Sequence, residues 1–228
     1  MELDDFKHVM VATPSYSGDV CMDFTWSLLQ SQMLCLGHKI LLDLEWVQNL
    51  SIVEAARNYL LYVFLKKTKY THIMFIDGDL GWQPDAIHRM VERQKYVIGG
   101  VYPRKNDKAE YPYVPLQDHT DVALRLPTGF MLCARTAIEA VCEDAPRFKM
   151  PYDGEIHEVP RIFEFKIDGE RNLVSEDYVF SDKLRDEGFR LFVEPNINFV
   201  HSGRNGWRGN LDKQTIPAVW EAIRRPNV

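Results

Sequence analysis

Short apolar runs alternate with longer stretches of helical periodicity in the first half of the chain. Four runs have the length of a buried strand: 8–13, 38–43, 72–77 and 96–101. Three stretches repeat apolar residues at helical spacing: 21–36, 52–67 and one that opens at Pro84. Strands that alternate with helices predict a mostly parallel sheet joined by right-handed crossovers, with helices on both faces. Ligands of such sheets gather at the carboxyl ends of the strands.

The pattern is less regular after Tyr102. Further elements are expected as strands at about 122–126, 189–193 and 197–201, an apolar segment at 162–167 and a helix over 176–187. A loop rich in proline, glycine and acidic residues is expected over 151–158. The fold class that follows is α/β, with a Rossmann-like, mostly parallel central sheet flanked by helices in a single domain over 1–228.

Composition narrows the possible partners. The chain has 228 residues and 46% hydrophobic content, which suits one domain with a substantial core. Its net charge of −6 argues against holding nucleic acid mainly through phosphates. Met1 to Lys7 lack the features of a signal peptide, and no apolar run has the length of a transmembrane segment. We therefore expect a cytoplasmic protein, in the host cytoplasm if it is viral, whose oligomeric state the sequence leaves open.

The segment Asp77-Gly78-Asp79 follows the third expected strand. Gly78 lets the turn bring both carboxylates toward one ligand without an intervening side chain. Two acidic groups at a strand end can bind a hard divalent cation, Mn²⁺ or Mg²⁺, with open positions for diphosphate oxygens. An ordinary acidic turn is the alternative. His201, at the end of the last expected strand, is a candidate third ligand, or else a structural histidine.

Two further groups carry candidate chemistry. Asp177 begins the expected helix 176–187, where it either removes a proton from an acceptor hydroxyl or, behind Ser175 as N-cap, only stabilises the helix N-terminus. Arg57 and Asn58 lie in the second helix, where the arginine either stabilises a bound phosphate or forms part of an exposed polar pair. Three aromatic residues near expected loops are candidates for stacking on a base or sugar, or for the core: Trp82, Tyr102 and Trp207.

Together these segments resemble the GT-A glycosyltransferases, especially compact family-2-like members of bacteria and viruses, over most of the chain. The matching segments, in chain order, are Val11-Ala-Thr-Pro-Ser15, Ala56-Arg-Asn58, Phe75-Ile-Asp-Gly-Asp79, Gly99-Gly-Val-Tyr102, Thr128-Gly-Phe130, Glu176-Asp177 and His201. The resemblance implies a nucleotide-sugar-binding half over 1–103 and an acceptor-binding and catalytic half over 104–228.

The resemblance also implies roles for single residues. Thr13, Pro14 and either Asp43 or Glu45 border the nucleotide, and Asp77 approaches both ribose and metal. Asp79 and His201 ligate the metal directly. Asp177 is the catalytic base of an inverting displacement. The remaining expected donor contacts are Arg57, Asn58, Gly78, Tyr102, Gly129 and Phe130.

The sequence thus predicts a metal-dependent glycosyltransferase with a nucleotide-sugar donor, UDP- or GDP-linked. Its acceptor is open between a saccharide, a glycan, a protein and a modified nucleic-acid base. Two alternatives are a sugar nucleotidyltransferase and a non-catalytic domain that binds nucleotide sugar or carbohydrate. The segment Thr13-Pro-Ser-Tyr-Ser-Gly18 argues against the nucleotidyltransferase, because it lacks a glycine-rich phosphate loop.

Overall fold

The computed structural model describes residues 6–106, 110–117, 121–203 and 206–212. An eight-stranded sheet forms its centre, in the order β2-β1-β3-β8-β5-β13-β7-β6. The bounds of these strands in chain order are β1 Lys7–Pro14, β2 Ile40–Val47, β3 His72–Ile76, β5 Val97–Gly99, β6 Val114–Pro115, β7 Val122–Arg125, β8 Phe130–Ala134 and β13 Leu191–Val193. Strands from both halves of the chain join this one sheet.

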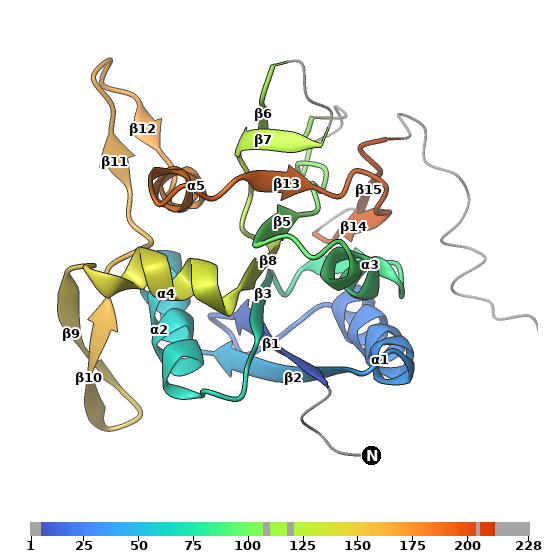
Figure 1. Cartoon of the computed structure of the whole chain (residues 1–228), viewed down its shortest axis with the longest axis horizontal. Coiled ribbons are helices and arrows are strands. Elements are labelled where there is room, and N and C mark those ends of the chain that lie inside the picture. The colour runs from blue at the N-terminus through green and yellow to red at the C-terminus, as the bar shows by residue number, and fades with distance from the viewer. Residues whose placement is uncertain (1–5, 107–109, 118–120, 204–205, 213–228) are drawn as a thin grey trace, which may run out of the picture.

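Five helices cover the two faces of the sheet (Figure 1). Their bounds are α1 Met22–Gly37, α2 Val53–Lys66, α3 Ala86–Glu92, α4 Arg135–Glu143 and α5 Glu176–Asp186. Alternate residues of β1 point to opposite faces: Met10 and Ala12 pack with α2, α4 and α5, whereas Val9 and Val11 pack with α1 and α3. The expected α/β class, with a mostly parallel sheet in one domain, is confirmed.

The first three strands are parallel, as the sequence predicts. β1 pairs with β2 on one side and with β3 on the other. The chain then reverses: β8 runs antiparallel to both β3 and β5 and lies between them. β13 extends the sheet parallel to β5, and β7 and β6 complete it. Because β1 and β3 are neighbours, the segments that follow them share one edge of the sheet.

A second, smaller sheet forms beside the turn that follows β3. It has the order β15-β14-β4, with β4 Leu80–Trp82, β14 Phe199–His201 and β15 Trp207–Gly209. Trp82 is 1% exposed, packs edge-on against Phe24 and donates its indole N–H to Ser31 Oγ at 2.9 Å. Trp82 therefore packs in the core and is not placed to stack on a ligand.

One expectation for the second half is wrong. The segment 151–158 is a hairpin rather than a loop, with β9 Arg147–Tyr152 and β10 Glu155–Pro160 joined by Asp153-Gly154. Both turn residues have positive φ, 49° and 80°, as a tight hairpin turn requires. The segment 162–167 contributes only β11 Lys166–Ile167, which pairs with β12 Leu173–Val174. Among the described helices, none combines the length and apolarity needed to cross a membrane.

Candidate functional site

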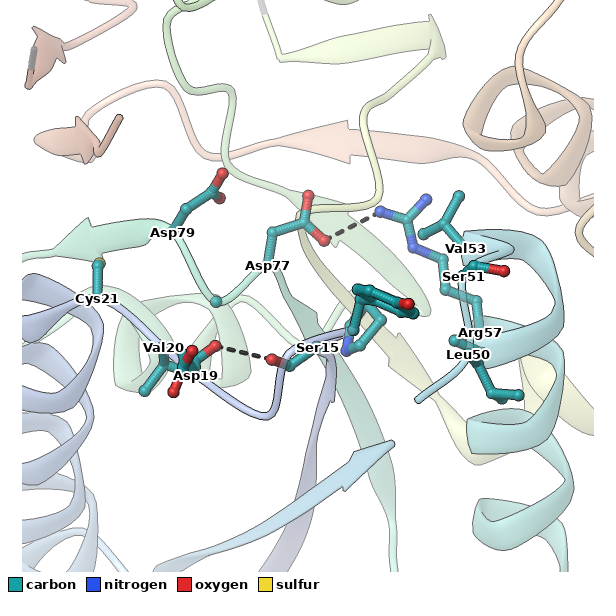
Figure 2. A pocket seen from close by; sticks show the side chains of 14 residues that line it. Ser15, Asp19, Val20, Cys21, Leu50, Ser51, Val53, Arg57, Asp77 and Asp79 are labelled. Atoms are coloured by element: carbon teal, nitrogen blue, oxygen red, sulfur yellow. Dashed lines mark hydrogen bonds and ion pairs between the residues drawn. The ribbon is translucent and has the colours of Figure 1, made fainter. Parts of the chain in front are cut away.

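A cavity of about 530 Å³ opens at the sheet edge where β1 and β3 end (Figure 2). Its walls come from three segments: residues 14–16 and 19–21 after β1, residues 50, 51 and 53 at the start of α2, and the turn 77–79 after β3. Ala56 and Arg57 continue the α2 wall. The site therefore forms where the topology of the sheet predicts a ligand.

The N-terminal ends of two helices border this cavity. Cys21 is the N-cap of α1, and Ile52 is the N-cap of α2. Backbone N–H groups at a helix N-terminus are unpaired within the helix and carry partial positive charge. An anionic group such as a diphosphate is accordingly favoured between these two ends.

Arg57 joins three carboxylates at the inner end of the cavity. The arginine lies on the buried face of α2, with its side chain 4% exposed. Its Nη2 donates to Asp77 Oδ1 at 3.0 Å, and its Nη1 donates to Glu176 Oε1 at 2.9 Å and to Asp177 Oδ1 at 2.6 Å. Figure 2 shows the guanidinium reaching from α2 toward Asp77. One cation thus ties the end of β3 to the first turn of α5.

The balance of charge in this cluster is negative. Burial lowers the pKa of Arg57, but the charges of Asp177, Asp77 and Glu176 outweigh that effect and raise it. Burial raises the pKa of Asp77, opposed by Arg57, and the neighbouring Asp177 and Asp79 raise it further. Burial and the charge of Asp177 likewise raise the pKa of Glu176. Three carboxylates around one guanidinium leave a site that attracts additional positive charge.

Asp79 and His201 meet through the small sheet. His201 pairs with Leu80 in the β4–β14 register, and Ser202 N donates to Asp79 O at 2.7 Å. Nε2 of His201 lies 3.6 Å from Asp79 Oδ2, and Lys105 also contacts that oxygen. Burial raises the pKa of Asp79, but its contacts with His201 and Lys105 prevail and lower it. The carboxylate of Asp79 therefore stays ionised at neutral pH.

These two residues fit part of a cation site. Nδ1 of His201 lies 2.8 Å from the carbonyl oxygen of Pro103, which can only accept, so Nδ1 carries a proton and Nε2 is the ring nitrogen left to bind a cation. Asp79 Oδ1 is buried, and no described atom hydrogen-bonds to it. In the described part of the chain, however, no three His, Cys, Asp or Glu side chains form a group that could hold a metal. A cation here would need ligand atoms from a bound substrate.

Gly129 allows Asp77 and Tyr102 to approach the chain closely. A Cβ at this position would lie 2.3 Å from the Tyr102 hydroxyl oxygen and 2.4 Å from Asp77 Oδ2. Burial, with the charges of Asp77 and Asp177, raises the pKa of Tyr102 well above its ordinary value, so the hydroxyl stays protonated. Phe130 is fully buried and packs against Trp82 and Phe199, so it supports the site from the core.

Seven of the expected donor-binding residues do not line the cavity: Thr13, Asp43, Glu45, Asn58, Tyr102, Gly129 and Phe130. β2 continues to Val47, so Asp43 and Glu45 fall within the strand, where they contact Lys69 and Lys67 respectively. The buried amide of Asn58 accepts from Ile162 N at 3.0 Å and Phe163 N at 2.8 Å and donates to Phe163 O at 2.9 Å. It therefore holds the backbone after β10. The side chain of Thr13 is buried, next to Pro14, which does line the cavity.

Sequence reasoning missed several residues of the site. The sequence marks Glu176 only as the neighbour of Asp177, whereas in the structure both carboxylates contact Nη1 of Arg57. Lys105 fell in a stretch without a recognisable pattern, and it contacts Asp79. The wall residues Tyr16, Asp19 and Ser51 belong to loops that follow β1 and β2. The sequence signal that could have identified them as site residues is their position in the loops that follow predicted strands.

No model of a known protein family matches the chain, and no curated protein matches its sequence. Among solved structures it is similar to A197 from STIV, with a TM-score of 0.55, 14% identity and 91% of each chain covered. S. aureus TarS 1-349 has a TM-score of 0.45 and 13% identity, covering 82% of this chain and 58% of that one. A glycosyltransferase involved in the glycosylation of the major capsid of PBCV-1 has a TM-score of 0.36 and 9% identity, covering 57% and 62%. At such identities, the likeness to A197 shows that the two chains share a fold.

Proposed function

We propose that the protein is a metal-dependent glycosyltransferase of the GT-A type, family-2-like, that uses a nucleotide-sugar donor and inverts the anomeric centre. The observation that carries this proposal is the contact of one buried guanidinium, Arg57, with both Asp77 and Asp177. Asp77 lines the cavity, and Asp177 begins the neighbouring helix. A donor in the cavity would have its reacting end near a carboxylate of the kind that a displacement needs.

The size and polarity of the cavity suit a nucleoside diphosphate. Its volume of about 530 Å³ lies within the usual range for small-molecule sites. The N-terminal ends of α1 and α2 favour the diphosphate, and Tyr16 and Leu50 offer apolar surface to a base. UDP- and GDP-linked sugars both meet these requirements.

Asp79 and His201 would bind Mn²⁺ or Mg²⁺, with Asp77 close by. The cation, when bound, supplies positive charge that stabilises the departing diphosphate. Asp79 brings the buried oxygen to which no described atom hydrogen-bonds, and His201 brings Nε2. Lys105 would have to leave Asp79 Oδ2 for the cation to use that oxygen, and it is then placed to contact the diphosphate.

Asp177 would act as the base. Its carboxylate accepts the proton of the acceptor hydroxyl while the hydroxyl oxygen bonds to the anomeric carbon, and the bond from that carbon to the diphosphate oxygen breaks. The hydroxyl attacks on the face opposite the diphosphate, which leaves with the electron pair, so the anomeric configuration inverts. Arg57 fixes the orientation of Asp177 by donating a hydrogen bond to Oδ1. The acceptor is a hydroxyl-bearing saccharide, glycan, protein or modified nucleic-acid base that reaches α5.

The decisive experiment measures nucleotide release from a panel of nucleotide sugars with Mn²⁺ or with EDTA. Release from one donor that needs Mn²⁺ and is lost in Asp79→Ala is the expected result. Donor binding by calorimetry without release, even with a panel of acceptors, would instead favour a non-catalytic binding domain. A protein that neither binds nor hydrolyses any nucleotide sugar in the presence of metal would overturn the proposal.

A further inference from the structure

The helix α1 buries one large apolar side chain and three small ones, and it exposes five large apolar ones. Its buried residues are Phe24, Ser27, Ser31 and Cys35. Its exposed residues include an apolar stripe of Met22, Trp26, Leu29, Met33 and Leu36, with exposed fractions from 40% at Trp26 to 80% at Met22. A surface helix normally shows the opposite arrangement, with its large apolar residues facing the core. The stripe therefore has the character of a surface that a partner covers.

The spacing of the stripe indicates the shape of that partner. Successive members are four, three, four and three residues apart. This is the spacing of the a and d positions of a heptad repeat, whose side chains insert between those of a facing helix. In α1 these positions point away from the sheet, because the opposite side of the helix carries Phe24 and Ser31. The stripe thus has the pattern of a helix that packs against another helix.

The charges around the stripe favour a second copy over a bilayer. The flanking e and g positions are Asp23, Thr25, Gln30, Gln32 and Gly37, of which one is charged. Two copies of α1 would therefore meet with little repulsion between like charges. Helices that lie on membranes commonly carry lysine or arginine beside the apolar face, and residues 22–37 contain neither.

The edge strand β2 exposes two further large apolar side chains. Ile40 and Leu42 pack in the same cluster as Phe24 of α1. Alternate residues of a strand share a face, so Leu44 and Trp46 point to the same side, and they are 38% and 58% exposed. Covering these residues and the stripe in two copies would bury on the order of 1,000 Å² or more, the area that specific protein interfaces require. α1 lies at the periphery of the molecule, where a second copy can reach it (Figure 1).

We propose that the α1 stripe is a homodimer interface, in which the α1 helices of two copies pack antiparallel about a two-fold axis. Such an axis makes the interface self-complementary. It sets Leu29, the central residue of the stripe, against Leu29 of the second copy. This proposal does not depend on the enzymatic one.

Sedimentation of the full chain over a range of concentrations tests the proposal. Wild type should form a dimer, and Leu29→Glu should raise the dissociation constant at least tenfold, because it places a charge in the middle of an apolar seam. Thr136→Glu is the matched control, since it makes the same substitution with glutamate at an exposed position of α4. Leu29 is 51% exposed, so its substitution should leave the fold intact, which circular dichroism verifies. Dimers of equal strength in wild type and Leu29→Glu would overturn the proposal.

Cysteine cross-linking gives an independent measurement. Under mild oxidant, Leu29→Cys should form a covalent dimer, whereas wild type and Thr136→Cys should not. Wild type that stays monomeric and floats with neutral vesicles, with floating lost in Leu29→Glu, would assign the stripe to a bilayer and overturn the proposal. Monomeric wild type in which Leu29→Glu makes residues 213–228 more sensitive to protease would assign it to that segment instead.

Discussion

Nε2 of His201 lies 3.6 Å from Oδ2 of Asp79, although 122 positions separate the two residues in the sequence. The antiparallel pairing of β4 with β14 produces this proximity, and the carbonyl oxygen of Pro103 fixes the protonated nitrogen of the ring. A carboxylate and an imidazole nitrogen held in this way resemble two ligands of a cation site.

We therefore predict that His201→Ala and Asp79→Asn each weaken Mn²⁺ binding by at least about tenfold, since losing even an outer partner of a metal ligand typically costs 10- to 100-fold. Calorimetry with Mn²⁺ and nucleoside diphosphate measures the effect. His38→Ala serves as the control for losing an exposed histidine. Unchanged Mn²⁺ affinity in His201→Ala would remove that residue from the site.

Asp177 and Glu176 form a matched pair, because both contact Nη1 of Arg57. If Asp177 is the base, Asp177→Asn should lower kcat by about 10²- to 10⁴-fold. Glu176→Gln should lower kcat far less, although it also removes one ion pair with Arg57. Urea unfolding of both variants measures the structural loss separately. Equal losses of kcat in the two variants would mean that Asp177 acts only through the ion-pair cluster.

Gly129 is predicted to tolerate no side chain. In Gly129→Ala the new methyl group overlaps Asp77 Oδ2 and the Tyr102 hydroxyl, both of which must shift. Crowding of this kind costs about 1–3 kcal/mol of stability, and the displaced Asp77 should also lower turnover. Adding Tyr102→Phe removes the hydroxyl and should restore part of the stability without restoring turnover. An unaltered melting temperature in Gly129→Ala would contradict the packing described for this position.

The first half of the fold was predictable because its signals are local. The strands β1, β2 and β3 and the helices α1 and α2 follow one another as apolar runs and periodic stretches, and each strand pairs with a neighbour in this series. β8 was missed because nothing local shows that Phe130–Ala134 inserts between β3 and β5. The hairpin at Asp153-Gly154 carried a recognisable turn signal, which the acidic composition of the segment obscured.

The site was predictable where a strand end carries the chemistry and not where distant segments meet. Asp77 and Asp79 follow directly from their place after β3. Arg57 and Asn58 have the same sequence signal, two polar residues in one helix, and both are buried. Only the tertiary structure distinguishes their roles. Arg57 contacts carboxylates 119 and 120 positions away in the sequence, whereas Asn58 hydrogen-bonds to backbone groups after β10.

Asn58 is predicted to matter for stability and not for donor binding. Asn58→Ala would leave the N–H groups of Ile162 and Phe163 and the carbonyl of Phe163 without this partner in a buried environment. Each such group costs about 1–3 kcal/mol, so the loss of all three partners should cost at least about 3 kcal/mol in urea unfolding. Thr136→Ala, at an exposed position, should change stability little. A large loss of donor affinity with normal stability would contradict this role.

His72 should make the fold less stable in mild acid. Burial, and secondarily the charge of Lys7, lowers the pKa of His72 from 6.5 to about 4. The unfolded chain therefore takes up a proton at this residue below pH 6.5, while the folded chain resists it until about pH 4, so stability is full above 6.5 and falls as the pH drops through this window. The shift corresponds to roughly 3 kcal/mol at most. His72→Gln should lose this dependence. The difference in unfolding free energy between wild type and His72→Gln should therefore change by up to roughly 3 kcal/mol between pH 7.5 and pH 4. His38→Gln is the control for the loss of an exposed histidine. A difference that stays constant across the range would show that His72 does not titrate abnormally in the folded protein.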